Sequence, residues 1–108
     1  MAANAALRLR KNSYIRNKHK PSMELRQQFD EAVSESKALS ERPSQGTMLE
    51  LYSLYKQATV GDINIDPPAN PFDFVAKAKY QAWFDLKGKS QSDAMSAYIY
   101  LVSKLKSY

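Results

Sequence analysis

Four stretches of this 108-residue chain place apolar residues three and four positions apart, which is the spacing of one face of an α-helix. Residues that favour the start or the end of a helix bound these stretches, among them Gly61, Gly88 and Ser90. No segment shows the alternation of β-branched and polar residues that is typical of a strand. The chain is therefore predicted to be all-α, with four helices in one domain.

The first two predicted helices are delimited by proline, threonine and glycine. Pro21 favours the first start, the apolar stripe runs on to Leu39, and Pro43 enforces a stop soon afterwards. Thr47 is the expected N-cap of the second helix, because an acidic residue three positions later completes a capping box. Gly61 is the expected stop of that helix.

The last two predicted helices follow a long linker rich in glycine and proline. Asn70 is the expected N-cap of the third helix, with Pro71 in its first turn, and the helix is expected to run through Leu86 to a stop at Gly88. Ser90 is expected to open the fourth. Its apolar stripe consists of Ala94, Met95, Tyr98, Leu101, Val102 and Leu105.

The composition argues against several kinds of chemistry. There is no cysteine, which excludes disulfides, thiolate zinc sites and cysteine nucleophiles. His19 is the single histidine and lies among basic residues near the start, so a catalytic triad or a histidine metal site is a poor hypothesis. We therefore expect no enzyme, no metal and no cofactor. The lack of a long apolar run predicts a soluble, unsecreted protein, with a cytoplasmic location.

The positive net charge of +5 is concentrated at one end of the chain. Residues 1–20 contain six basic residues and no acidic one, whereas residues 21–108 hold ten basic and eleven acidic residues. We therefore expect a basic arm at 1–21 and a nearly neutral domain at 22–108. The arm is open to three interpretations: a solubilising tail, a targeting presequence for organelle import, or a patch for an anionic membrane or nucleic acid.

The second predicted helix carries two stripes where a core needs only one. Met48, Leu51, Leu54, Tyr55 and Ala58 form the first stripe, and Leu49, Tyr52, Lys56 and Thr59 form the second. The second stripe can offer ring stacking, hydrogen bonds and positive charge to one ligand, a combination that suits a phosphorylated heteroaromatic group. The alternative is that the tyrosines are core residues with hydrated hydroxyls and that the lysine is ordinary surface.

Polar residues also interrupt the stripes of the other helices. Lys79 falls within the apolar face of the third helix. Either its stem packs on Trp83 while its ammonium group extends into water, or the ammonium group binds an anionic ligand. Lys37 flanks the stripe of the first helix, Ser36 interrupts it, and Tyr98 is centred on the stripe of the fourth. Together these side chains predict a phosphate site beside an apolar groove.

Three blocks of sequence carry a resemblance to a known family. They are YSLYKQATVGDIN at 52–64, KAKYQAWFDLKGKS at 77–90 and DAMSAYI at 93–99. In content, order and spacing they resemble the acyl-CoA-binding protein family, over approximately 29–105. The resemblance implies an up-down-down-up four-helix bundle that carries long-chain acyl-coenzyme A as an intracellular buffer in lipid metabolism, without altering it.

The resemblance also implies which residues contact the ligand. The expected acyl-CoA-binding residues are Lys37, Tyr52, Ser53, Leu54, Tyr55, Lys56, Lys79 and Tyr98. By the same resemblance Tyr55 stacks on adenine, Tyr52, Lys56 and Lys79 hold the ribose 3′-phosphate, and Lys37 lies near the remaining phosphates. The acyl chain is expected to lie against Phe29, Ala32, Met48 and Leu49.

The chain departs from the family pattern at three places. Tyr80 stands where tryptophan is common, Ser36 stands where an aliphatic residue is usual, and the linker with Pro67 and Pro68 has one additional residue. At Ser36 we expect a water or a locally altered pocket. The expected partners of a monomeric carrier are fatty acyl-CoA and, through the arm, acyl-CoA-using enzymes or an anionic membrane. The alternative function is a small helical nucleic-acid-binding module that uses the basic arm.

Overall fold

The computed structural model describes residues 21–107 as four helices. Their bounds are α2 Pro21–Ser36, α3 Gln45–Thr59, α4 Phe74–Phe84 and α5 Gln91–Lys106. No strand occurs within these residues, and the all-α prediction is confirmed. The basic residues of the predicted arm all lie in 1–20, outside the described part of the chain.

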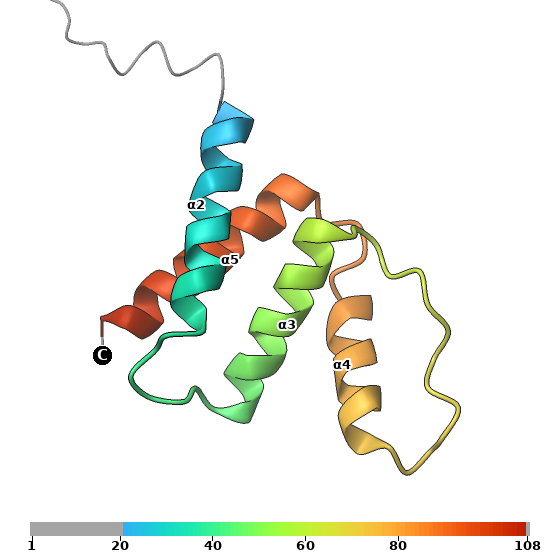
Figure 1. Ribbon diagram of the computed structural model, residues 1–108. Helices are drawn as coiled ribbons and strands as arrows, with labels where there is room; N and C mark the ends of the chain where they lie inside the picture. Colours follow the sequence, from blue (N-terminus) through green and yellow to red (C-terminus); the bar gives the residue numbers. More distant parts are fainter. Residues whose placement is uncertain (1–20, 108) are drawn as a thin grey trace, which may run out of the picture.

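The helices form the expected up-down-down-up bundle (Figure 1). α2 descends in the figure, α3 and α4 both ascend, and α5 descends again. α5 contacts both α2 and α3, while α4 packs against α3. The long linker between α3 and α4 is required because two consecutive parallel helices need a return path between them.

The main core lies between α2, α3 and α5. Its buried members are Phe29, Ala32, Leu51, Leu54, Ala58, Ala94, Tyr98 and Val102. Phe29 is only 1% exposed and meets the Tyr98 ring edge-on, with 5.2 Å between ring centroids and 69° between planes. Ala58 and Ala94 are completely buried, and such small side chains allow close approach of the helix backbones. The predicted stripes of the first, second and fourth helices therefore supply this core.

The N-cap predicted for α3 is wrong by three residues. Ser44, in extended conformation, is the N-cap, and its hydroxyl oxygen accepts a hydrogen bond from the Thr47 backbone N–H at 3.2 Å. Thr47 instead lies in the first turn, where its hydroxyl oxygen accepts a bond from the Ser44 hydroxyl at 3.1 Å. Serine and threonine are both favourable caps. Ser44 is the cap because Gln45 and Gly46 form part of the first turn of the helix.

The N-cap predicted for α4 is wrong for a similar reason. Asp73 caps the helix, with its carboxylate accepting from the Ala76 N–H at 3.0 Å. Asn70 instead closes a turn before the helix, where its side-chain oxygen accepts from the Phe72 N–H at 2.9 Å. Asparagine and aspartate both stabilise turns and caps, so either could have begun this helix.

The predicted stop at Gly61 is confirmed, whereas the third helix ends before Gly88 and two helices are shorter than expected. Gly61 and Gly88 have φ values of 99° and 95°, a left-handed conformation that ends a helix at low cost for glycine. α4 nevertheless ends at Phe84, so Leu86 lies in the following turn. α2 ends at Ser36, before Leu39, because the next two backbone N–H groups bond to carbonyls three residues back.

A polar cluster ties the end of α3 to the connection between α4 and α5. We call it the polar clamp and define it as Gln57, Asp62, Trp83 and Gln91. The buried Gln57 donates from Nε2 to Asp62 Oδ1 and to the Lys89 carbonyl, both at 2.8 Å. Gly88 N–H donates to the same carboxylate oxygen at 2.9 Å. These bonds span the chain from α3 to the start of α5.

The other two members of the polar clamp hold the backbone directly. Trp83 Nε1–H donates to the Gly61 carbonyl at 2.9 Å, and its ring is only 1% exposed. Gln91 Nε2 donates to the carbonyls of Ala58 and Thr59 at 3.2 and 3.1 Å. The last carbonyls of α3, which have no partners within their own helix, are thereby satisfied from α5. The polar clamp fixes the position of α4 and hence of the side chains that α4 presents.

Candidate functional site

A groove of about 540 Å³ opens between α2, α3 and the middle of α5. Eight residues line it: Val33, Ser36, Lys37, Met48, Leu51, Tyr52, Tyr55 and Tyr98. Four of the predicted ligand-binding residues, Lys37, Tyr52, Tyr55 and Tyr98, are brought together here although they come from three segments of the chain. The lining combines one cation and three phenols with an apolar surface.

Tyr55 presents an accessible ring in this groove. Its ring stacks on Phe29, with 6.0 Å between centroids and 23° between planes, while 41% of the residue remains exposed. Phe29 is itself fixed in the core by its edge contact with Tyr98. The Tyr55 ring is therefore held in place from the core side and can offer its remaining surface to a flat ligand group.

Two lysines lie over aromatic rings where α3 meets α4. Lys79 Nζ is 5.3 Å from the centroid of the Tyr52 ring, and Lys56 Nζ is 5.1 Å from the Trp83 ring. The ammonium of Lys79 thus lies over Tyr52, and the ammonium over Trp83 is that of Lys56. Within residues 21–107 the ion pairs join Arg26 to Asp30 and Lys106 to Glu35, and neither involves these lysines.

The remaining predicted head-group residues lie inside the protein. Ser53 and Leu54 are buried, and neither lines the groove. The Ser53 hydroxyl donates to the Glu50 carbonyl one turn earlier, at 3.1 Å. Consecutive residues of a helix point about 100° apart, so the run from Tyr52 to Lys56 cannot face one ligand with all its side chains.

The residues predicted to hold an acyl chain divide in the same way. Met48 lines the groove, whereas Phe29 and Ala32 are buried in the core. Leu49 is half-buried and lies outside the lining. The apolar wall consists instead of Val33, Met48 and Leu51. Leu51 was expected only as a member of a core stripe, and Val33 was not predicted at the site.

The altered position Ser36 takes part in a short chain of hydrogen bonds in the groove wall. Tyr98 Oη–H donates to Ser36 Oγ at 3.0 Å, and the Ser36 hydroxyl donates to the Val33 carbonyl at 2.7 Å. Burial raises the pKa of Tyr98, although the bond with Ser36 opposes this shift. The phenol is therefore neutral at physiological pH, and Ser36 satisfies its hydrogen from within the protein.

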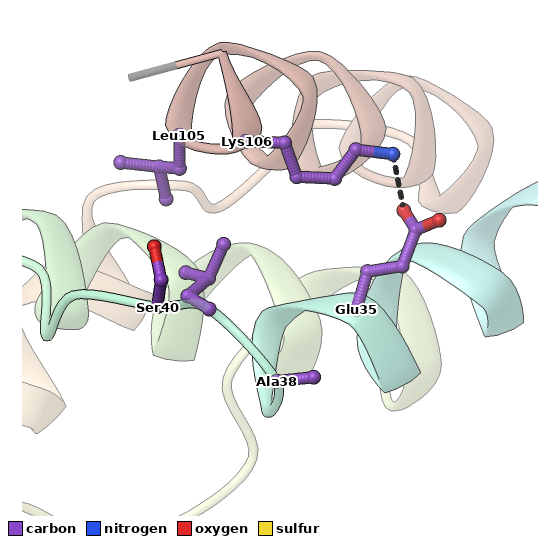
Figure 2. A pocket seen from close by; sticks show the side chains of 6 residues that line it. Glu35, Ala38, Ser40, Leu105 and Lys106 are labelled. Carbon is purple, nitrogen blue, oxygen red and sulfur yellow. Dashed lines mark hydrogen bonds and ion pairs between the residues drawn. The ribbon is translucent and has the colours of Figure 1, made fainter.

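A second hollow of about 290 Å³ lies between the C-terminal ends of α2 and α5 (Figure 2). Its polar members include Glu35 and Lys106, whose carboxylate and ammonium groups form an ion pair at 3.0 Å. None of the predicted ligand-binding residues lines this hollow. Its charges compensate each other, so it lacks the cationic and aromatic character of the groove.

Residues 21–107 contain neither a cluster suited to bind a metal ion nor a helix suited to span a membrane. No group of three or more His, Cys, Asp or Glu side chains in this part of the chain is arranged to hold a metal ion. Among the described helices, none combines the length and the apolar character required to cross a bilayer.

Comparisons with known proteins agree with this arrangement. The family model described as Acyl CoA binding protein matches residues 26–102. The crystal structure of Oryza sativa Acyl-CoA-Binding Protein 2 is similar, with 39% identity, a TM-score of 0.75, and coverage of 79% of this chain and 91% of that chain. The crystal structure of ACBP from Moniliophthora perniciosa is similar with 36% identity, a TM-score of 0.69, and coverage of 74% and 78%. With its four-helix fold and its family match over most of its length, this chain belongs to the acyl-CoA-binding protein family.

Proposed function

We propose that this protein binds long-chain acyl-CoA esters in the groove between α2, α3 and α5 and acts as their intracellular carrier and buffer. The observation that carries the proposal is the composition of one groove: an accessible ring at Tyr55, a cation at Lys37 and an apolar wall around Met48. Membership of the acyl-CoA-binding protein family supports the class of ligand. Both halves of an amphipathic thioester find a matching surface here.

The head group would use the aromatic and cationic side chains. Tyr55 would stack on adenine, while Tyr52, Lys56 and Lys79 would hold the ribose 3′-phosphate. Because Lys79 lies over the Tyr52 ring, its ammonium and the phenol hydroxyl could act on the same phosphate. Bonds from ammonium to phosphate are charge-assisted and stronger than neutral ones. Lys37 would contribute charge at the remaining phosphates.

The acyl chain would lie on the apolar wall of the groove. Val33, Met48 and Leu51 line it, whereas Leu49 lies outside the lining. Phe29, which contacts Tyr55 and Tyr98, supports two lining residues from the core. Burial contributes about 0.8 kcal/mol per methylene group, so a long chain would supply much of the affinity even when it is partly covered.

Calorimetry on the full chain tests this division of labour. We expect hexadecanoyl-CoA to bind more tightly than free coenzyme A, because only the ester buries apolar methylene groups. Equal affinities would contradict the assignment of the apolar wall. Incubation of the same complex should release no free coenzyme A above the buffer rate, as expected for a carrier, whereas accelerated thioester hydrolysis would argue for an enzyme.

The lysine assignments are tested with variants that remove the charged side chain. Lys79→Ala and Lys56→Ala should each weaken hexadecanoyl-CoA binding by about 1.5–3 kcal/mol, the range of a hydrogen bond to a charged group. Lys77→Ala is the matched control, because Lys77 is exposed on α4 and points about 200° away from Lys79. A loss in the control equal to that of Lys79→Ala would show that general charge, and not the groove, attracts the ligand.

A further inference from the structure

The hydrogen-bond chain in the groove wall has a defined direction. It runs from Tyr98 Oη–H to Ser36 Oγ and from the Ser36 hydroxyl to the Val33 carbonyl, over distances of 3.0 and 2.7 Å. Tyrosine and serine each have one hydroxyl hydrogen, so both hydrogens are already donated. The Val33 carbonyl ends the chain, and all three residues line the groove.

The remaining hydrogen-bonding capacity of this pair is entirely that of an acceptor. A hydroxyl oxygen has two lone pairs, and one lone pair of Ser36 Oγ is occupied by Tyr98. The oxygen atoms of Tyr98 and Ser36 can therefore accept from a ligand, but neither can donate without breaking an existing bond. Donor capacity in the lining comes from Lys37 and from the hydroxyls of Tyr52 and Tyr55.

We propose that Ser36 and Tyr98 form a hydrogen-bond-accepting spot that binds an O–H or N–H donor of the acyl-CoA ligand at the groove wall. This inference rests on the proposed function of the groove. The donor has two possible sources, a hydroxyl group on the acyl chain or an amide N–H of the pantetheine arm. Ser36 is the specificity-determining residue, because it accepts the hydroxyl hydrogen of Tyr98 and so leaves the phenol oxygen only as an acceptor for the ligand.

The effect of Ser36 follows from what an apolar residue would do in its place. Without the Ser36 oxygen, the hydrogen of the Tyr98 hydroxyl has no acceptor in this chain of bonds and becomes available to a ligand carbonyl. The polarity of the spot is thereby reversed from accepting to donating. A site that bonds a donor discriminates against a ligand lacking it, because buried polar oxygen atoms are then left without partners.

Calorimetry on the full chain with a series of ligands tests the inference. The ligands are hexadecanoyl-CoA, its 2-, 3- and 16-hydroxy derivatives, its 3-oxo derivative, free coenzyme A, and adenosine 3′,5′-bisphosphate, which lacks the pantetheine arm. The proteins are the unchanged chain, Ser36→Ala, Ser36→Val and the control Ser34→Ala. Ser34 is exposed on α2 and lies outside the groove lining.

If a chain hydroxyl is the donor, the unchanged protein binds one hydroxy derivative about three- to tenfold more tightly than the plain ester, as one hydrogen bond allows. Ser36→Ala and Ser36→Val abolish this preference and shift it toward the 3-oxo ester. If a pantetheine amide is the donor, both variants weaken all coenzyme A compounds by a common factor of that size and leave adenosine 3′,5′-bisphosphate unchanged.

Two results would overturn the inference and leave the proposed function standing. One is unchanged affinity of both Ser36 variants for every ligand. The other is an equal loss for adenosine 3′,5′-bisphosphate and the acyl esters, since this would indicate a general structural effect. Failure of the unchanged protein to bind any acyl-CoA ester would overturn the proposed function together with the inference.

Discussion

The polar clamp and the groove both place polar side chains among apolar ones, but they differ in whether these side chains have partners within the protein. In the polar clamp, the donors of Gln57 and Trp83 end on acceptors of the same chain. In the groove, Tyr55 keeps much of its ring exposed. Beside it, Lys79 lies over the ring of the lining residue Tyr52, with no carboxylate pairing it within residues 21–107. Polar groups that find partners inside the fold stabilise it, whereas those left on an open surface are available to a ligand.

This contrast implies a separation between stability and binding. A buried group that loses its partner costs the free energy of desolvation without compensation. An exposed cation over a ring contributes little to folding because water competes for it. Changes in the polar clamp should therefore lower the free energy of unfolding, and changes in the groove should mainly lower ligand affinity.

The largest effect is expected at Trp83. Trp83→Ala removes a fully buried ring and the bond to the Gly61 carbonyl, so we expect a loss of about 3–5 kcal/mol in the free energy of unfolding. Urea denaturation followed by circular dichroism measures it. Phe84→Ala is the control, because this neighbouring ring is 43% exposed. Similar losses in both variants would remove the distinction between the polar clamp and ordinary surface packing.

A smaller loss is expected at Gln57. Gln57→Ala leaves the Lys89 carbonyl without its donor and Asp62 Oδ1 with the Gly88 N–H alone, which should cost about 1–3 kcal/mol in the free energy of unfolding. The same denaturation experiment measures the change. Gln81→Ala serves as its control, since Gln81 makes a comparable amide-to-carboxylate bond at an exposed site. If the control were the more destabilised, the bonds of the polar clamp would not be responsible.

The fold was largely predictable because helix periodicity is a local property of sequence. Apolar spacing identified the four helices, and Gly61 marked a true stop, whereas α4 ends at Phe84, before the stop predicted at Gly88. The starts at Thr47 and Asn70 were wrong, because several neighbouring residues can cap and the sequence does not show which one adopts the extended conformation. Competition between equivalent local signals therefore limited the boundaries.

The candidate site was predictable only in part. Four residues that meet in the groove could be singled out from the sequence, because each stood out on or beside a helical stripe: Lys37, Tyr52, Tyr55 and Tyr98. Val33 and Leu51 gave no such signal, since a lining apolar residue looks the same in sequence as a core residue. Gln57 could have been noticed as a polar residue beside the buried Ala58, but its partners are up to 32 positions away in sequence. Long-range pairing of this kind depends on the packed arrangement of the helices.

The pH dependence of stability tests the polar clamp through Asp62. The Gly88 N–H and then the Gln57 amide hydrogen-bond its carboxylate and lower its pKa. A group with a lowered folded pKa stabilises the protein above its unfolded pKa, and that stabilisation is lost as the pH falls through the folded pKa. Asp62→Asn should therefore flatten the acid loss of stability in denaturation measured from neutral to strongly acidic pH. Asp66→Asn, at an exposed linker position, should retain the steeper loss, and identical profiles for the two variants would contradict this role.

The smallest expected effect on stability is at Lys79, where the comparison is most directly tested. Lys79→Ala removes only an exposed cation over Tyr52, so the free energy of unfolding should fall by less than about 1 kcal/mol while acyl-CoA affinity falls markedly. Lys104→Ala is a matched control, because its ammonium lies 5.1 Å from the Tyr100 ring outside the groove. It should share the small stability change and leave affinity unaltered. A stability loss at Lys79 as large as that of Gln57→Ala would mean that this lysine holds α4 against α3, and the separation between a stabilising clamp and a binding groove would fail.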